Sequence, residues 1–164
     1  MLRAGKCLVA AALVVAGCAA PTGSSTRPAS PSPVAVTLAS GTFDVDLGGM
    51  TTIAIDATAA GDGASGELDV EMPEGGGFSV DLQCTRTTDT GILLIGGDVT
   101  DSTIDQANEE SRAAIALEPG TPVKSVLWFE DQPANSCPAF LESIPDDEIG
   151  DFVQPVEGAI ELGP

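Results

Sequence analysis

Carboxylates are the side chains in this sequence best suited to chemistry, because it contains 25 Asp and Glu residues and no histidine. Without histidine, Ser-His-Asp and Cys-His sites and the usual zinc-hydrolase ligand sets are excluded. The acidic residues are densest at Asp146, Asp147, Glu148 and Asp151, where hard oxygen ligands could hold calcium. Their spacing does not match an EF-hand loop, and a solvated acidic surface is the simpler interpretation. We therefore predict no catalytic residue, no metal site and no cofactor.

Two further carboxylate pairs are Asp44 with Asp46, on one face of an expected strand, and Asp98 with Asp101, at a strand end. A glycosidase needs two carboxyl groups about 5–10 Å apart across a cleft. Sugar clefts usually offer aromatic platforms, and this chain has only five Phe, one Trp and no Tyr. The sequence therefore favours a protein that is not an enzyme.

The N-terminus has the order of an export signal. Arg3 and Lys6 precede a short apolar stretch that could not cross a bilayer as a helix. The stretch ends Val15-Ala16-Gly17-Cys18, which resembles a lipobox: the thiol accepts a lipid, and small side chains flank the cleaved bond. We predict that 1–17 are a lipoprotein signal peptide and that Cys18 becomes the lipidated first residue. An ordinary signal peptide with an accidental cysteine is the alternative.

Export also bears on the remaining cysteines. Cys7 would leave with the signal and Cys18 would carry lipid, so Cys84 and Cys137 are the pair that remains. A lone pair of cysteines in an oxidising compartment favours a disulfide. This bond would stabilise the fold by about 4 kcal/mol on the chain-entropy model. Two buried free thiols are the alternative.

Trp128 and Phe129 form the only adjacent aromatic pair. Neighbours in a strand point to opposite faces, so one of them belongs to the core. The other is either core as well or an exposed contact. If Trp128 is exposed, it is the best candidate anchor for a partner.

Charge and composition divide the chain into three parts. The formal net charge is −19, and it becomes −21 once Arg3 and Lys6 are removed. Such a charge repels nucleic acid, so we expect no nucleic-acid partner. Segment 18–36 combines the lipidated cysteine with a Pro-, Ser- and Thr-rich tether, which stays extended. Segment 37–164 has the size of one domain, and we interpret it as a single acidic β-domain.

Within this domain the apolar residues recur with a period of two, which is typical of half-buried strands. Gly and Pro clusters separate the runs and supply turns. A Gly96-Gly97 pair suggests a bulge, and Ser136 with Pro138 suggests the start of a short helix at 137–144. The expected strands are 42–47, 52–58, 67–72, 78–84, 91–100, 112–117, 123–130 and 158–162.

About eight short antiparallel strands and at most one short helix predict an all-β fold, either a single β-sandwich or a small barrel. In the run 78–84, Cys84 shares the parity of Phe78, Val80 and Leu82, so we expect its side chain to point into the same core.

Over roughly 66–162 the chain resembles a family of uncharacterised secreted or lipoprotein β-domains of actinobacteria. The matching features are the strand 78–84 that ends in Cys84, the strand 96–102, the aromatic run 126–129 before Cys137, and the closing segment 155–162. The chain departs from the family at 116–120, where a longer loop is expected. The resemblance implies fold and location and no activity.

The sequence therefore predicts an exported protein held at the outer face of the cell membrane by lipid on Cys18. Its β-domain would be a non-enzymatic binding or structural module of the cell envelope, with a protein or small molecule as partner. The alternative is a carrier with an apolar cavity of several hundred Å³ for a lipid or other small molecule.

Overall fold

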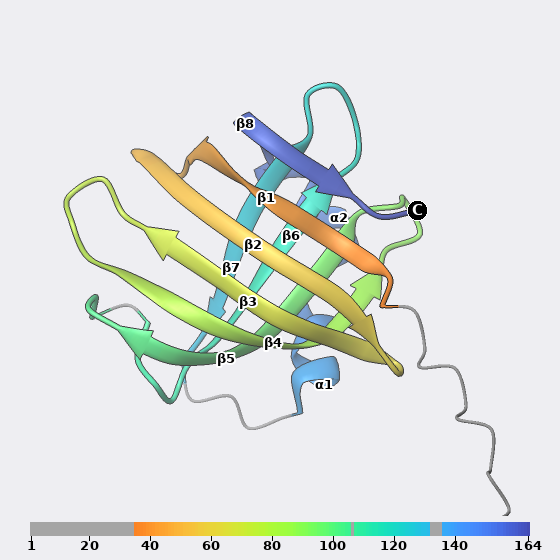
Figure 1. Ribbon diagram of the computed structural model, residues 1–164, viewed down its shortest axis with the longest axis horizontal. Helices are drawn as coiled ribbons and strands as arrows, with labels where there is room; N and C mark the ends of the chain where they lie inside the picture. The colour runs from red at the N-terminus through yellow and green to blue at the C-terminus, as the bar shows by residue number, and fades with distance from the viewer. Residues whose placement is uncertain (1–34, 106, 132–135) are drawn as a thin grey trace, which may run out of the picture. The chain divides into compact units, whose positions relative to one another are not determined.

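Eight strands and two short helices make up the described part of the chain, shown in Figure 1. The computed structural model describes residues 35–105, 107–131 and 136–164. The elements, in chain order, are β1 (Thr37–Asp46), β2 (Met50–Ala60), β3 (Gly63–Glu71), β4 (Gly77–Thr87), β5 (Leu93–Ser102), β6 (Arg112–Glu118), β7 (Lys124–Glu130), α1 (Cys137–Ser143), α2 (Asp146–Phe152) and β8 (Gln154–Leu162).

The strands form a closed antiparallel barrel in which each strand pairs with the next along the chain. Closure comes from β8, which pairs with β1 from Ala39↔Leu162 to Val45↔Val156. On its other side β8 meets β7 at only two positions, Lys124↔Pro155 and Ser125↔Gln154. The predicted all-β class is confirmed, and of the two predicted architectures the barrel is the one adopted (Figure 1).

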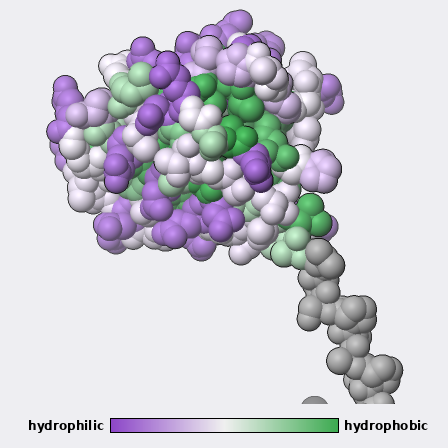
Figure 2. Space-filling view, turned by 45° about the horizontal axis from the view of Figure 1, so that its top comes forward, coloured by the Kyte–Doolittle hydropathy of each residue, from purple (hydrophilic) through white to green (hydrophobic). Residues whose placement is uncertain are grey.

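Alternation along the strands fills the barrel with aliphatic side chains and a few phenylalanines. The largest of them are 2 % exposed or less, as expected of a close-packed core. On the face shown in Figure 2, hydrophilic residues surround a smaller apolar patch. The large residues buried inside the barrel include Phe43, Val45, Ile53, Leu68, Leu82, Ile95, Ile115 and Leu117.

The predicted strands all overlap observed ones, and the predicted start of α1 is confirmed: Ser136 is its N-cap, without a side-chain capping bond, and Pro138 lies in its first turn. Two local predictions were wrong. First, α2 is a second helix where we expected at most one, because Pro145 and Gly150 in the sequence indicate a turn there. Second, the bulge near Gly96-Gly97 lies in the opposite strand, where Gln83 is the extra residue between Leu82↔Gly97 and Cys84↔Gly96.

That bulge reverses the predicted direction of Cys84. Leu82 pairs with Gly97 and points inward, whereas Cys84 pairs with Gly96 and points to the outer face of the wall. An extra residue shifts the alternation by one, so the side chains after it change face. Cys84 is buried, as expected, but under α1 and not inside the barrel.

No helix among the described residues is both long enough and apolar enough to cross a membrane.

Glycine at position 66 permits the close approach of β3 to β2. Its φ is +141°, and a Cβ there would lie 1.8 Å from the backbone oxygen of Asp56 on β2. Gly66→Ala should therefore lower the free energy of unfolding by about 3 kcal/mol, measured by urea denaturation. Gly150→Ala is the matched control, because nothing lies within 4 Å of its added methyl group and α2 should gain about 0.5–1 kcal/mol. Equal stability of the two variants would contradict this account of the β2–β3 contact.

Candidate functional site

Cys84 and Cys137 form a disulfide that joins β4 to the first residue of α1. Their Cα atoms are 5.8 Å apart and the closed loop spans a sequence separation of 53. The predicted bond is therefore confirmed. It ties the helical segment to the barrel wall at the point where the Gln83 bulge turns Cys84 outward.

The two helices create a second hydrophobic core on the outer face of the wall. Phe140 and Leu141 of α1 and Ile149 of α2 are buried against outward-facing side chains of β4 to β7. The described residues thus form two cores, one inside the barrel and one beneath the helices. The full set of buried residues in this outer core is Cys84, Ile92, Leu94, Ala114, Ala116, Val126, Cys137, Phe140, Leu141, Ile144, Ile149 and Val153.

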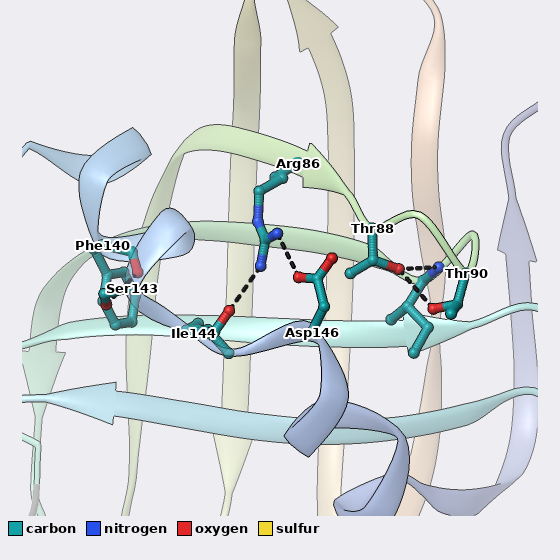
Figure 3. A network of polar contacts seen from close by, with 8 residues as sticks. Arg86, Thr88, Thr90, Phe140, Ser143, Ile144 and Asp146 are labelled. Atoms are coloured by element: carbon teal, nitrogen blue, oxygen red, sulfur yellow. Dashed lines mark hydrogen bonds and ion pairs between the residues drawn. The ribbon is translucent and has the colours of Figure 1, made fainter.

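Arg86 holds the junction between the helices, as Figure 3 shows. One guanidinium nitrogen donates to the Asp146 carboxylate at the start of α2, and another donates to the Ile144 carbonyl at 2.9 Å. Arg86 lies two residues after Cys84 on β4, so the disulfide and the arginine act on neighbouring parts of the same strand. Together they bind both helices to the wall.

The acidic run 146–151, which we assigned to no helix or strand from its sequence, belongs to α2. Asp146, Asp147 and Glu148 occupy its first turn, where negative charge is favoured by the exposed N–H groups of a helix start. Asp146 is also paired with Arg86. Among the described residues no group of three His, Cys, Asp or Glu side chains is arranged to hold a metal ion.

The other candidate carboxylates have local partners. Asp44 accepts a hydrogen bond from Thr52 at 2.6 Å, and Asp46 accepts from the backbone N–H groups of Gly48 and Gly49 at 3.1 and 3.0 Å. These bonds stabilise the β1–β2 hairpin.

Asp98 forms an ion pair with Arg112 at 2.8 Å. Asp101 lies on β5 opposite Ser79, three residues from Asp98 and on a different cross-strand row. The structure does not bring the predicted carboxylate pairs together across a cleft.

A row of like charges crosses the barrel wall, and sequence reasoning missed it. Asp56, Glu67, Asp81 and Asp98 are directly opposite one another on β2, β3, β4 and β5. Like charges opposite each other are unfavourable unless solvent or a cation screens them. Only the strand register aligns these residues, because they lie far apart along the chain.

The adjacent aromatic residues Trp128 and Phe129 lie on opposite faces of the barrel wall. Phe129 points into the barrel and packs edge-on against Phe78, with ring centroids 5.0 Å apart. Trp128 is half-buried against the outer core, and Phe152 of α2 packs edge-on over it at 5.8 Å. Phe152 itself is 53 % exposed, so Phe152 and not Trp128 presents the exposed aromatic surface.

Beside Phe152, the weakly paired junction of β7 and β8 opens into a groove of about 400 Å³, which we call the seam groove. Its lining comes from β7, from the residues at or just after the ends of β1 and β3, from the last residue of α2 and from the first residue of β8. Asp46 and Gln154 are its polar lining residues. Its apolar lining residues are Leu47, Met72, Val126, Leu127, Phe129 and Phe152.

Comparison of the chain with protein-family models, with curated proteins and with solved structures found no match. The resemblance to actinobacterial secreted β-domains stays a prediction from the residues.

Removing the disulfide with Cys84→Ala and Cys137→Ala together should lower the free energy of unfolding by about 4 kcal/mol, because the unfolded chain regains the freedom of a long loop. The measurement is the urea midpoint of the variant and of the parent protein. Adding reductant should shift the parent towards the variant and leave the variant unchanged. A parent protein insensitive to reductant, with free thiols on peptide mapping, would contradict the bond.

Replacing Arg86 should release α2 from the wall. In Arg86→Gln the Asp146 carboxylate loses its ion pair and the Ile144 carbonyl loses its donor, so stability should fall by about 1–2 kcal/mol. Trp128, the only tryptophan, lies under Phe152 of α2, so its emission should shift to the red. Lys124→Gln is the control, since the exposed Lys124–Glu118 pair should contribute about 0.5 kcal/mol or less. Unchanged Trp128 emission in Arg86→Gln would refute this role for Arg86.

Proposed function

We propose that this protein is an exported lipoprotein, anchored to the outer face of the cell membrane by lipid on Cys18. Its barrel serves there as a non-enzymatic binding module. The observation that carries the anchor is the order of the N-terminus: positive residues, an apolar stretch, Val15-Ala16-Gly17-Cys18, and then a proline-rich tether. Such a tether lets a lipid-anchored domain stand clear of the headgroups.

Three properties support the proposal of an exported binding module. A disulfide suits an oxidising compartment outside the cytoplasm. The strongly negative charge favours solubility and disfavours contact with anionic lipid headgroups. The seam groove, lined in part by the exposed Phe152, offers apolar surface for contact with a partner.

The alternative, a carrier of a lipid or other small molecule, requires an apolar cavity within the barrel. The inward-facing side chains of the described strands are packed against one another, with Phe43, Leu68 and Ile115 1 % exposed or less. This packing supports the binding module over the carrier, because a ligand would have to displace the core.

Replacing the anchor residue tests the proposal. Cys18→Ala should abolish incorporation of labelled palmitate and move the protein from the membrane fraction, or leave its signal uncleaved. Cys7→Ala is the matched control: it lies in the same segment but outside the lipobox, so processing and fractionation should be unchanged. Intact-mass analysis that finds unmodified Cys18 in the membrane-associated protein would overturn the lipid anchor.

A further inference from the structure

The β7–β8 junction leaves part of β7 without a partner strand. Pairing with β8 ends at Ser125↔Gln154, because the chain before Gln154 turns away into α2. Residues 126–130 continue β7 for its remaining length. No described strand pairs with them on the β8 side, so this length of β7 is an open edge within a nominally closed barrel.

The register identifies the backbone groups along that edge. The Val123 carbonyl accepts the Val156 N–H at 3.0 Å, and Ser125 lies opposite Gln154, so both residues face β8. In an antiparallel sheet alternate residues face the same neighbour. Leu127 and Phe129 therefore direct their N–H and C=O groups to the open side, while Val126 and Trp128 bond to β6. This pattern is a ready template for one more strand.

The seam groove lies along this edge. Its lining contains Leu127 and Phe129 of β7 together with Leu47, Met72 and Phe152 from other elements. An added strand would pair with the backbone of Leu127 and Phe129 and place alternate side chains against these apolar residues. Backbone pairing supplies affinity and the apolar pocket supplies selectivity, so the groove suits an extended peptide.

Charge defines the peptide further. Asp46 borders the seam groove, and Glu130 and Asp131 follow Phe129 at the end of the open edge. The whole chain carries a formal charge of −19. A basic segment would be attracted to this region and an acidic one repelled.

We propose that the seam groove binds an extended segment of a partner protein, rich in Lys or Arg and alternating with aliphatic residues, which adds to β7 as a strand. This rests on the proposed function, because it assigns the site and partner of the binding module.

Residues 158–162 of β8 pair with β1 and with no other described strand, so their second edge is the competing place for strand addition. Glu157, just before this edge, and Glu161 within it are exposed, and Gly158 has a φ of +129°, a backbone conformation that other residues rarely adopt. Charged side chains and irregular backbone are the usual protection of an exposed edge. The β7 edge has an apolar groove beside it instead, so we assign the site to β7.

The test uses the full-length protein and a fluorescein-labelled peptide, Lys-Val-Thr-Val-Lys-Val-Thr-Val-Lys, with binding followed by fluorescence polarisation. We expect saturable binding and slower amide hydrogen exchange at Leu127 and Phe129. A peptide with Glu in place of Lys, and one with N-methylated alternate residues, should each bind about ten-fold more weakly or worse. Binding that N-methylation leaves unchanged would overturn strand addition.

Two matched variants locate the site. Leu127→Pro removes an N–H that faces the open edge of β7 and spares the bonds to β6, so affinity should fall about ten-fold or more. Ile160→Pro removes the equivalent N–H from the open edge of β8 and should leave affinity within about two-fold. The reverse result would move the site to β8, and equal loss in both variants, or no saturable binding by the parent protein, would refute the proposal.

Two side-chain substitutions provide a second comparison if the proline variants do not fold. Phe152→Ser removes an exposed aromatic ring from the seam groove and should weaken binding several-fold. Val36→Ser changes an exposed apolar residue before β1 and should have no effect. Peptide binding by Cys18→Ala separates the two proposals, because the protein without its lipid should still bind the peptide. Loss of peptide binding in a correctly anchored protein would refute the groove proposal alone.

Discussion

Closure of the sheet by β8 on β1 is the constraint on which the rest of the structure depends. Seven consecutive pairs, from Ala39↔Leu162 to Val45↔Val156, bring the last strand of the chain against the first. Closure removes that edge and encloses the aliphatic core. Most of β8 therefore pairs with β1, and the helical segment just before β8 limits its contact with β7 to two pairs. The narrow β7–β8 junction and the seam groove are thus consequences of how the barrel closes.

The single extra residue at Gln83 has an equally wide effect. By turning Cys84 outward it allows the disulfide to reach α1, and two residues later Arg86 reaches the start of α2. The helices then cover Trp128 and the small outward-facing residues of β6, Ala114 and Ala116. A bulge beside a functional element is a common way to redirect a side chain. Here it creates the outer core and, through α2, places Phe152 at the border of the seam groove.

Electrostatics and packing have separate roles in this molecule. The carboxylates that stand out in the sequence have structural roles. Asp46 stabilises a turn, Asp146 stabilises the start of α2 and Asp44 makes a cross-strand contact. The remaining acidic residues give the wall a negative field, with the row from Asp56 to Asp98 as its clearest alignment. That field repels acidic partners, and at physiological salt it is screened over about 8 Å. Apolar contact with a partner is instead provided by the seam groove.

The sequence by itself determined the all-β class, the approximate positions of the eight strands and the Cys84–Cys137 bond. These follow from local signals: a period of two, turn residues, and a lone pair of cysteines. Only the tertiary structure showed that the sheet closes as a barrel and not as a sandwich, that Cys84 points outward and that 146–152 is helical. It also brought Phe152 to the open edge of β7. The physical reason is that each depends on strand register and on which strands become neighbours. Register is a property of pairs of segments distant in the chain, and a shift of one residue reverses every side chain that follows.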